Sequence, residues 1–431
     1  MLFYALEDLA FMKNKSIHHW IIVAICCGLS AASIGICFNS LGVFFTPVSA
    51  ELGVGIGAFA LHVTVSNLLI GLFSTIGMKL VKKYHFRTMV SLGILMAGGS
   101  TMLMSLGHNI WEFYLLGAVR GIGCSLFALV IITYIIGNWF DEKHGFAVGL
   151  TLSFSGLSGA FFSPMLGYLI TQVGWRYTYL ITGICIIVLA LPGTLLLLEP
   201  QPEKRHLLPY GGKMIDKAAQ SAKVASARKV EFLSIPFIAV ALFATLVPAI
   251  TGITQHFPGY VESLGSTAAI GAMMISAAMI GNIIFKLLIG LLSDKIGPVN
   301  ACSVMISVNL LSLILLMVTN PVENQPILLA SAFLFGTTYA VGAVGTSLVT
   351  RHVFGVEQYA AVYPYISICI AVGSATSLTI TGLLYDLFGT YQFSLFGGIA
   401  FGVLSLLILQ GLRAWRPAPM PIRYIAVQSP E

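Results

Sequence analysis

The sequence predicts an all-α membrane protein with twelve transmembrane helices, arranged as two pseudo-symmetric six-helix bundles. Hydrophobic residues make up 57% of the 431 residues and charged residues only 9%, whereas a soluble domain carries about 25% charged residues. The mean hydropathy is +0.93. Apolar runs follow one another along the chain, and its length leaves room for roughly twelve spans of about 20 residues. Helix is predicted because an open sheet cannot satisfy its edges in lipid.

Each apolar run is long enough to cross about 30 Å of hydrocarbon at about 1.5 Å per residue. The first six runs lie at about 20–45, 57–80, 88–107, 112–136, 145–171 and 176–198. Six more lie at about 232–257, 267–292, 299–319, 326–350, 359–384 and 391–413. The predicted organisation is therefore an N-terminal segment (1–19), a first bundle (20–198), a linker (199–231), a second bundle (232–413) and a tail (414–431).

The basic residues predict the orientation. Of the 22 Lys and Arg, all but Arg120, Arg176 and Lys286 fall in the termini and in alternate loops, with seven of them in 199–231. Because cytoplasmic loops carry the excess of Lys and Arg, we expect both termini and the linker to be cytoplasmic, in a plasma or inner membrane. The net charge of +6 is thus a topology signal and does not indicate a nucleic-acid partner. A short basic helix over 214–229 is an alternative to a plain linker.

A loop motif follows the eighth apolar run. Gly290 would allow close helix approach, and Asp294 could face the positive N-terminal end of a neighbouring helix, such as the eleventh, and hold the cytoplasmic side shut. Gly297 turns the chain before Pro298. The alternative is a simple capped turn. Gly290, Asp294, Lys295 and Gly297 together resemble the signature loop of the major facilitator superfamily, whose members are two-bundle transporters.

Other stretches narrow the resemblance to the oxalate/formate antiporter and monocarboxylate porter branch. They are 43–47, 139–149, 335–342 and 385–391. In that branch a basic residue four positions before the loop glycine binds the substrate carboxylate, and this position is Lys286. Proton-coupled members often have an acid where this chain has Asn282. Oxalate exchangers have a lysine on helix eleven, where this chain offers Tyr363.

The charges within the spans support an anionic substrate independently of the resemblance. Arg120 and Lys286 lie in apolar runs, and all 16 acids lie in loops, tails or span ends. Intramembrane cations cost several kcal/mol unless they are paired or face water. A bound anion would pair them. The alternatives are a structural Arg120 bonded to backbone carbonyls and a Lys286 that snorkels to the cytoplasmic face.

Further candidates are polar residues at suitable depth. His62 and His256 could carry a proton near neutral pH, or could be packed histidines. The sequence places weaker substrate candidates within spans at Asn39, Tyr134 and Tyr339, and Gln255 lies at a similar depth. The seven cysteines fall in apolar runs without disulfide or metal spacing. We find no enzyme constellation, phosphate loop or metal cluster, so no catalysis or cofactor is expected.

The predicted function is secondary active transport of a small organic anion, most simply a monocarboxylate, by proton-linked symport or anion exchange. Alternating access between two bundles around a central site is the expected mechanism. The partners are this anion, protons and the lipid bilayer, and a monomer is expected. The rival functions are export of amphipathic or drug-like compounds, and a non-transporting membrane sensor built on the same scaffold.

Overall fold

The structure is a computed structural model that describes residues 17–205, 207–211, 234–320 and 322–413. Most of the predicted N-terminal segment and linker, including the alternative helix at 214–229, and all of the predicted tail lie outside the described residues. Within the described part the chain is helical, and one isolated β-bridge joins Phe140 to Tyr210.

The first half of the chain forms six spans. The first is Ile17–Leu52, which includes a π-helical stretch η1 (Ala31–Asn39), a 3-10 turn η2 (Leu41–Phe44) and α2 (Phe45–Leu52). The next elements are α3 (Ile56–Lys83), α4 (Phe86–Leu103), η3 (Met104–Leu106), α5 (Ile110–Ser125), α6 (Leu129–Trp139) and α7 (His144–Leu196). Pro202–Arg205 then forms the short turn η4.

The second half repeats this plan. Its elements are α9 (Ile235–Ile250), η6 (Thr251–His256), α10 (Phe257–Ser263), α11 (Ala268–Ile296), α12 (Pro298–Val318), α13 (Gln325–Phe335), α14 (Thr337–Ala340), η7 (Val341–Gly345), α15 (Thr346–Phe388) and α16 (Gln392–Arg413). In both halves the first and fourth spans are interrupted by 3-10, π or non-helical turns. This shared irregularity supports the predicted pseudo-symmetry.

The described residues contain 11 continuous helical stretches that are long and apolar enough to cross a membrane. One of them, Phe146–Leu196, has 51 residues, which is more than twice the length that a bilayer requires. It breaks at Gly174, where φ is 80° and ψ is 164°. A positive φ of this kind suits glycine because it lacks a Cβ. Counting the two sides of this break separately gives the twelve predicted spans.

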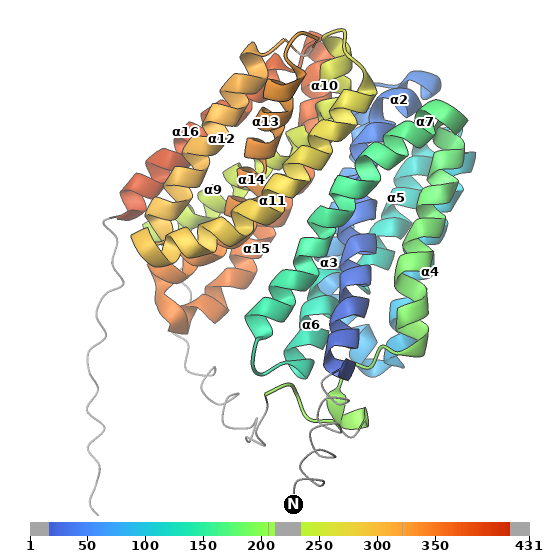
Figure 1. Cartoon of the computed structure of the whole chain (residues 1–431), viewed down its shortest axis with the longest axis vertical. Helices are drawn as coiled ribbons and strands as arrows, with labels where there is room; N and C mark the ends of the chain where they lie inside the picture. The colour runs from blue at the N-terminus through green and yellow to red at the C-terminus, as the bar shows by residue number, and fades with distance from the viewer. Residues whose placement is uncertain (1–16, 206, 212–233, 321, 414–431) are drawn as a thin grey trace, which may run out of the picture.

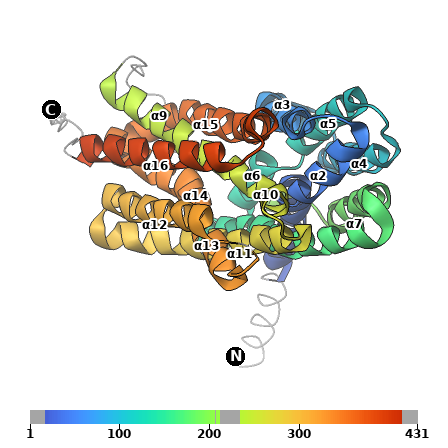
Figure 2. The same cartoon turned by 90° about the horizontal axis from the view of Figure 1, so that it is seen from above.

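The two halves lie side by side (Figure 2) and their ribbons diverge toward the bottom of Figure 1. We call the upper end, which holds Gly53, Gly265 and Gly389, the seam end. We call the lower end, which holds Tyr84 and Gly297, the linker end. Apolar side chains from both halves, among them Phe45, Ile253 and Met279, share one buried cluster, so the halves pack directly against each other.

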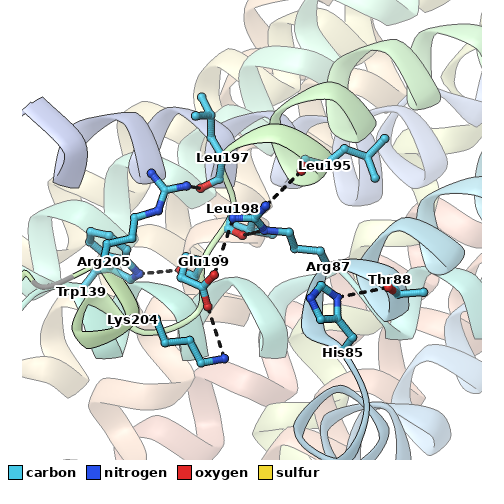
Figure 3. A network of polar contacts seen from close by, with 10 residues as sticks. All are labelled: His85, Arg87, Thr88, Trp139, Leu195, Leu197, Leu198, Glu199, Lys204 and Arg205. Carbon is cyan, nitrogen blue, oxygen red and sulfur yellow. Dashed lines mark hydrogen bonds and ion pairs between the residues drawn. The ribbon is translucent and has the colours of Figure 1, made fainter.

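At the linker end a polar network fastens the residues after α7 to the first half (Figure 3). Arg87 donates from Nε to the Leu198 carbonyl at 2.7 Å and lies 3.6 Å from the Glu199 carboxylate. Lys204 approaches the same carboxylate at 3.5 Å, and the Trp139 indole donates to the Glu199 carbonyl at 2.7 Å. These contacts hold the start of the predicted linker against the first half.

Candidate functional site

The two halves are joined at the seam end by Asp386, which ends the eleventh span. Its two carboxylate oxygens accept hydrogen bonds of 2.8 Å from the backbone N–H groups of Ile56 and Gly57, at the start of α3. These N–H groups have no partner within their own helix, and the positive end of the helix dipole favours an acid there. A side chain of one half thus caps a helix of the other, and this end of the molecule is shut.

Close backbone packing reinforces this contact. A Cβ added to Gly57 would lie 2.4 Å from the backbone nitrogen of Leu383. Two turns deeper, the Thr64 hydroxyl donates to the Ala375 carbonyl at 2.7 Å and lies 2.8 Å from the Thr379 hydroxyl. Helix α3 and the second part of α15 are therefore held together from the seam end to about half of their length.

The interrupted first spans of the two halves meet below the seam. Gln255 donates from Nε2 to the Asn39 carbonyl at 3.1 Å, and its Oε1 accepts from the Gly42 N–H at 2.9 Å. The Asn39 amide in turn donates to the Ser155 carbonyl at 3.1 Å. Buried Asn39 and Gln255 thus link backbone groups that the breaks in these helices leave available.

Helix α11 presents one stripe of residues to the other half. Ala272, Met279 and Ile283 of this stripe lie opposite Gly167, Gly159 and Gly156 of α7, respectively. Lys286 is seven residues beyond Met279 and three beyond Ile283, so it lies on the same face of the helix. It therefore points between the halves, one turn beyond the last of these contacts.

Lys286 has no partner of opposite charge among the described residues. Its side chain is half-buried, and no hydrogen bond or ion pair holds its ammonium there. One turn earlier, Asn282 is buried and its Oδ1 has no hydrogen-bond partner. An ammonium and an amide oxygen, both unsatisfied and one helical turn apart, form a site that can take an anion with a polar group beside it.

Two further predicted residues lie next to this pair. Met279 lies between Asn282 and the first half of the protein. Its sulfur lies 3.9 Å from the Asn282 amide, and its Cγ lies 3.0 Å from the position that a Cβ on Gly159 would take. The Asn39 Cβ lies 2.9 Å from that same position. Tyr339 directs its hydroxyl to the Thr251 carbonyl at 3.5 Å and interacts with Gln255. Asn39 and Asn282 thus lie against Met279, Tyr339 lies against Gln255, and Lys286 follows Asn282 one turn along α11. We call these four residues the central site.

Arg120 lies apart from this region, inside the first bundle. Its side chain is 0% exposed. One guanidinium nitrogen donates to the Ser66 hydroxyl at 3.2 Å, the group lies 5.9 Å from the Phe38 ring, and Nε has no hydrogen-bond partner. His62 is equally buried, with Nδ1 2.5 Å from the Phe59 carbonyl and Nε2 unpartnered. In this conformation neither Arg120 nor His62 reaches solvent.

The loop motif at the linker end is not engaged in this conformation. Asp294 is exposed and forms no hydrogen bond or ion pair within the described part of the chain. A Cβ on Gly290 would meet nothing within 4 Å, so no helix approaches closely there. Gly297 has a φ of 84° and ends α11. The contacts that the gate hypothesis predicts for a closed linker end are therefore not made in this conformation.

Comparison with known proteins identifies the family. The model of the Major Facilitator Superfamily matches residues 27–378 and 273–424. The chain is a member of the major facilitator superfamily. A bacterial homologue of the lysosomal transporter Spinster, solved in an inward-facing and occupied conformation, superposes with a TM-score of 0.72 at 14% identity, covering 93% of this chain and 98% of that one. Such a match shows the shared fold.

Curated relatives of this superfamily member are transporters at low identity. Monocarboxylate transporter 13 of Bos taurus is 24% identical over 87% of this chain and 84% of its own length. The oxalate:formate antiporter of Oxalobacter formigenes is 24% identical over 78% of this chain and 77% of its own. The alignment spans 42% of the MFS-type transporter pynF of Aspergillus niger and 49% of a probable transporter of Saccharomyces cerevisiae, so the chain covers less than half of these two relatives.

The remaining candidate site residues of this superfamily member lie outside the central site. Tyr363 stacks on Tyr359 at 4.9 Å, nearer the linker end. Tyr134 lies 6.5 Å from Phe86 and lines a cavity of about 470 Å³ at the linker end, together with Arg87, Glu199 and Lys204. His256 is buried at the seam, where its Nε2 lies 2.9 Å from the Leu378 carbonyl.

Sequence reasoning missed the role of Asp386, because its motif was matched only as a family resemblance. The signal was available: Asp386 is an acid at the end of an apolar span, with Gly382 one turn before it. A glycine on that face permits the close approach of α3 that the cap requires, since a Cβ on Gly382 would lie 2.5 Å from Gly57 Cα.

Proposed function

We propose that this protein is a secondary active transporter that carries a small organic anion, of the monocarboxylate class, across a cell membrane by alternating access. The family supports transport, and the monocarboxylate and oxalate:formate relatives support a carboxylate substrate. The linker end, near which most of the described basic residues lie, faces the cytoplasm in this proposal. The conformation described above is then open to the inside and shut to the outside.

In this mechanism the anion enters from the linker end and reaches the central site. Its carboxylate pairs with the Lys286 ammonium, for which no acid within the described ranges competes. Asn282 and Tyr339 offer an amide and a hydroxyl to the rest of the molecule. Closure of the linker end brings Asp294 toward the start of the eleventh span, and opening of the seam end separates Asp386 from α3. The anion is then released on the other side.

The unpaired Lys286 on the inter-half stripe of α11 is the observation that carries this proposal. The test is a panel of small carboxylates assayed by thermal shift on purified protein and then by uptake into proteoliposomes. A charge-assisted hydrogen bond contributes about 1.5–3 kcal/mol, so Lys286→Met should weaken carboxylate binding by at least about tenfold. Lys295→Met, which removes an exposed charge from the same helix, is the matched control and should bind normally.

Three results would count against the proposal. If Lys286→Met binds carboxylates as tightly as the wild type, Lys286 only snorkels and Arg120 becomes the leading anion site. If no carboxylate shifts the melting temperature while amphipathic organic compounds do, the protein is an exporter of the latter. Binding without flux in proteoliposomes would identify a sensor.

A further inference from the structure

A second group of unsatisfied polar atoms lies at the seam end, away from the central site. The buried oxygens are Oε2 of Glu262 on α10, Oγ1 of Thr46 on α2 and the hydroxyl of Tyr391 just before α16. None has a hydrogen-bond partner of proper geometry. They come from three elements and from both halves of the protein.

These three oxygens converge on one side of α10. A Cβ on Gly259 would lie 2.7 Å from the Tyr391 hydroxyl and 3.3 Å from Thr46 Oγ1. Glu262 is three residues further along the same helix, so it is on the same face. The Glu262 carboxylate lies close enough to interact electrostatically with both Thr46 and Tyr391.

The surroundings of Glu262 are aromatic and contain no basic side chain paired with it. The Tyr391 ring, 3% exposed as a residue, stacks on Tyr385 at 4.3 Å and lies 5.7 Å from the ring of His256. Tyr260 lies on the same helix as Glu262. Among the described ion pairs at this end, the one cation is Arg176, which is 2.9 Å from Glu51.

The other charged and titratable groups facing this cluster are Asp386, His256 and Tyr260. Asp386 on α15 accepts from the Ile56 and Gly57 N–H groups, and the Tyr260 hydroxyl donates to the carbonyl of Leu316. The Nε2 of His256 lies 2.9 Å from the Leu378 carbonyl, and its buried Nδ1 has no partner. No cation among the described residues is paired with Glu262, so its charge is not neutralised by an ion pair there.

A proton satisfies this cluster better than a metal ion does. Glu262 is half-buried as a residue, but its Oε2 is buried. A charge on this buried oxygen without a cation is costly, whereas a protonated Glu262 can donate to one hydroxyl and accept from the other. All three oxygens then have partners. Ca²⁺ and Mg²⁺ take six or more oxygen ligands, whereas the described side chains that meet here offer one carboxylate and two hydroxyls.

We infer that Glu262 is a proton-binding site of the outer seam: it is protonated while the seam is shut and exchanges its proton with the outside when the halves part there. The inference rests on the proposed alternating-access function and gives it a proton path that is separate from the anion site. Lowering the external pH then stabilises the seam-shut conformation, because closure requires the protonated acid.

The test measures the seam directly and needs no substrate. Spin labels are attached at Leu106→Cys and Val322→Cys, which are 67% and 58% exposed at the seam end of opposite halves, in a variant with the seven native cysteines replaced. The distance between the two labels is measured by pulsed electron–electron double resonance from pH 5 to 9. The ratio of seam-open to seam-shut protein should rise with pH, by up to about tenfold per pH unit while one proton is released.

Glu262→Gln imitates the protonated acid, so this variant should be mostly shut at every pH. The exposed outer acid Glu323, changed to Gln, is the matched control and should keep the wild-type pH response. A wild-type response in Glu262→Gln would overturn the inference. So would a distance change caused by exchanging sodium for a bulky organic cation at constant pH, since that would indicate a metal cation. Failure of carboxylate transport alone leaves these distances unchanged, so the two proposals are tested separately.

Discussion

The carboxylate of Asp386 accepts a hydrogen bond of 2.8 Å from the backbone N–H of Ile56, a residue 330 positions earlier in the chain. The acid ends the eleventh span and the amide begins the second. At the opposite end of the protein Asp294 lies in the last turn of α11, but it is exposed. Asp386 is hydrogen-bonded, whereas Asp294 forms no hydrogen bond or ion pair within the described part of the chain. This difference distinguishes the shut seam end from the linker end.

The first prediction follows from this contact. Asp386→Asn keeps the size of the side chain but removes its charge and one of its acceptors, which should cost the shut seam about 1–2 kcal/mol. The population of seam-open protein should rise roughly five- to thirtyfold. An impermeant maleimide added from outside should then label a cysteine at the buried position Leu378 faster. An unchanged labelling rate would show that the contact does not hold the seam.

The second prediction concerns Gly57, which is packed against the backbone of Leu383. Gly57→Ala introduces a Cβ that the shut seam cannot accommodate without movement, and overpacking of this kind costs about 1–3 kcal/mol. We expect more seam-open protein and slower uptake. Gly71→Ala, on the same helix with nothing within 4 Å of the added Cβ, is the control and should behave as the wild type. Equal uptake rates in the two variants would show that the packing at Gly57 does not hold the seam shut.

The third prediction concerns the linker end. Asp294→Asn should slow transport while leaving carboxylate affinity nearly normal, because the charge acts only when this end closes. Turnover in proteoliposomes and binding by thermal shift separate the two effects. If turnover is unchanged, the loop around Asp294 and Gly297 is only a turn.

The fourth prediction concerns the two histidine candidates. His62 and His256 are both buried in the seam-shut conformation, so either could exchange a proton only after a rearrangement. Glutamine at the true carrier should abolish uptake driven by a pH gradient but spare anion exchange. The two assays are run on each variant. If both variants still accumulate substrate, the proton is carried by another residue, such as Glu262.

The spans could be predicted from the sequence because lipid imposes one strong requirement, long apolar helices, and the chain meets it plainly. The depth of Lys286, Asn282 and Asn39 along their helices follows from residue number, whereas their role in substrate binding stays a prediction. The face of a helix on which a residue lies is harder to predict. Tyr134 lies 6.5 Å from Phe86, and its contact with substrate stays a prediction.

Contacts between distant segments could not be predicted from residue patterns. The cap of α3 by Asp386 and the meeting of Gln255 with Gly42 depend on how the two bundles dock. The conformation that the protein adopts could also not be predicted from the sequence, because the free energies of two conformations of one transporter differ by only a few kcal/mol. Patterns of hydrophobicity describe what both arrangements have in common.

In the proposed transport cycle, the position of Lys286 has a consequence for the protein without a bound anion. When the linker end closes, the stripe of α11 beyond Ile283 becomes covered by the other half, and the ammonium loses water. With no acid beside it, this loss costs several kcal/mol. A bound carboxylate replaces the lost water, so the loaded protein turns over more easily than the vacant one. The return of the vacant protein is then the slow step, and an anion waiting on the far side should accelerate the exit of its counterpart.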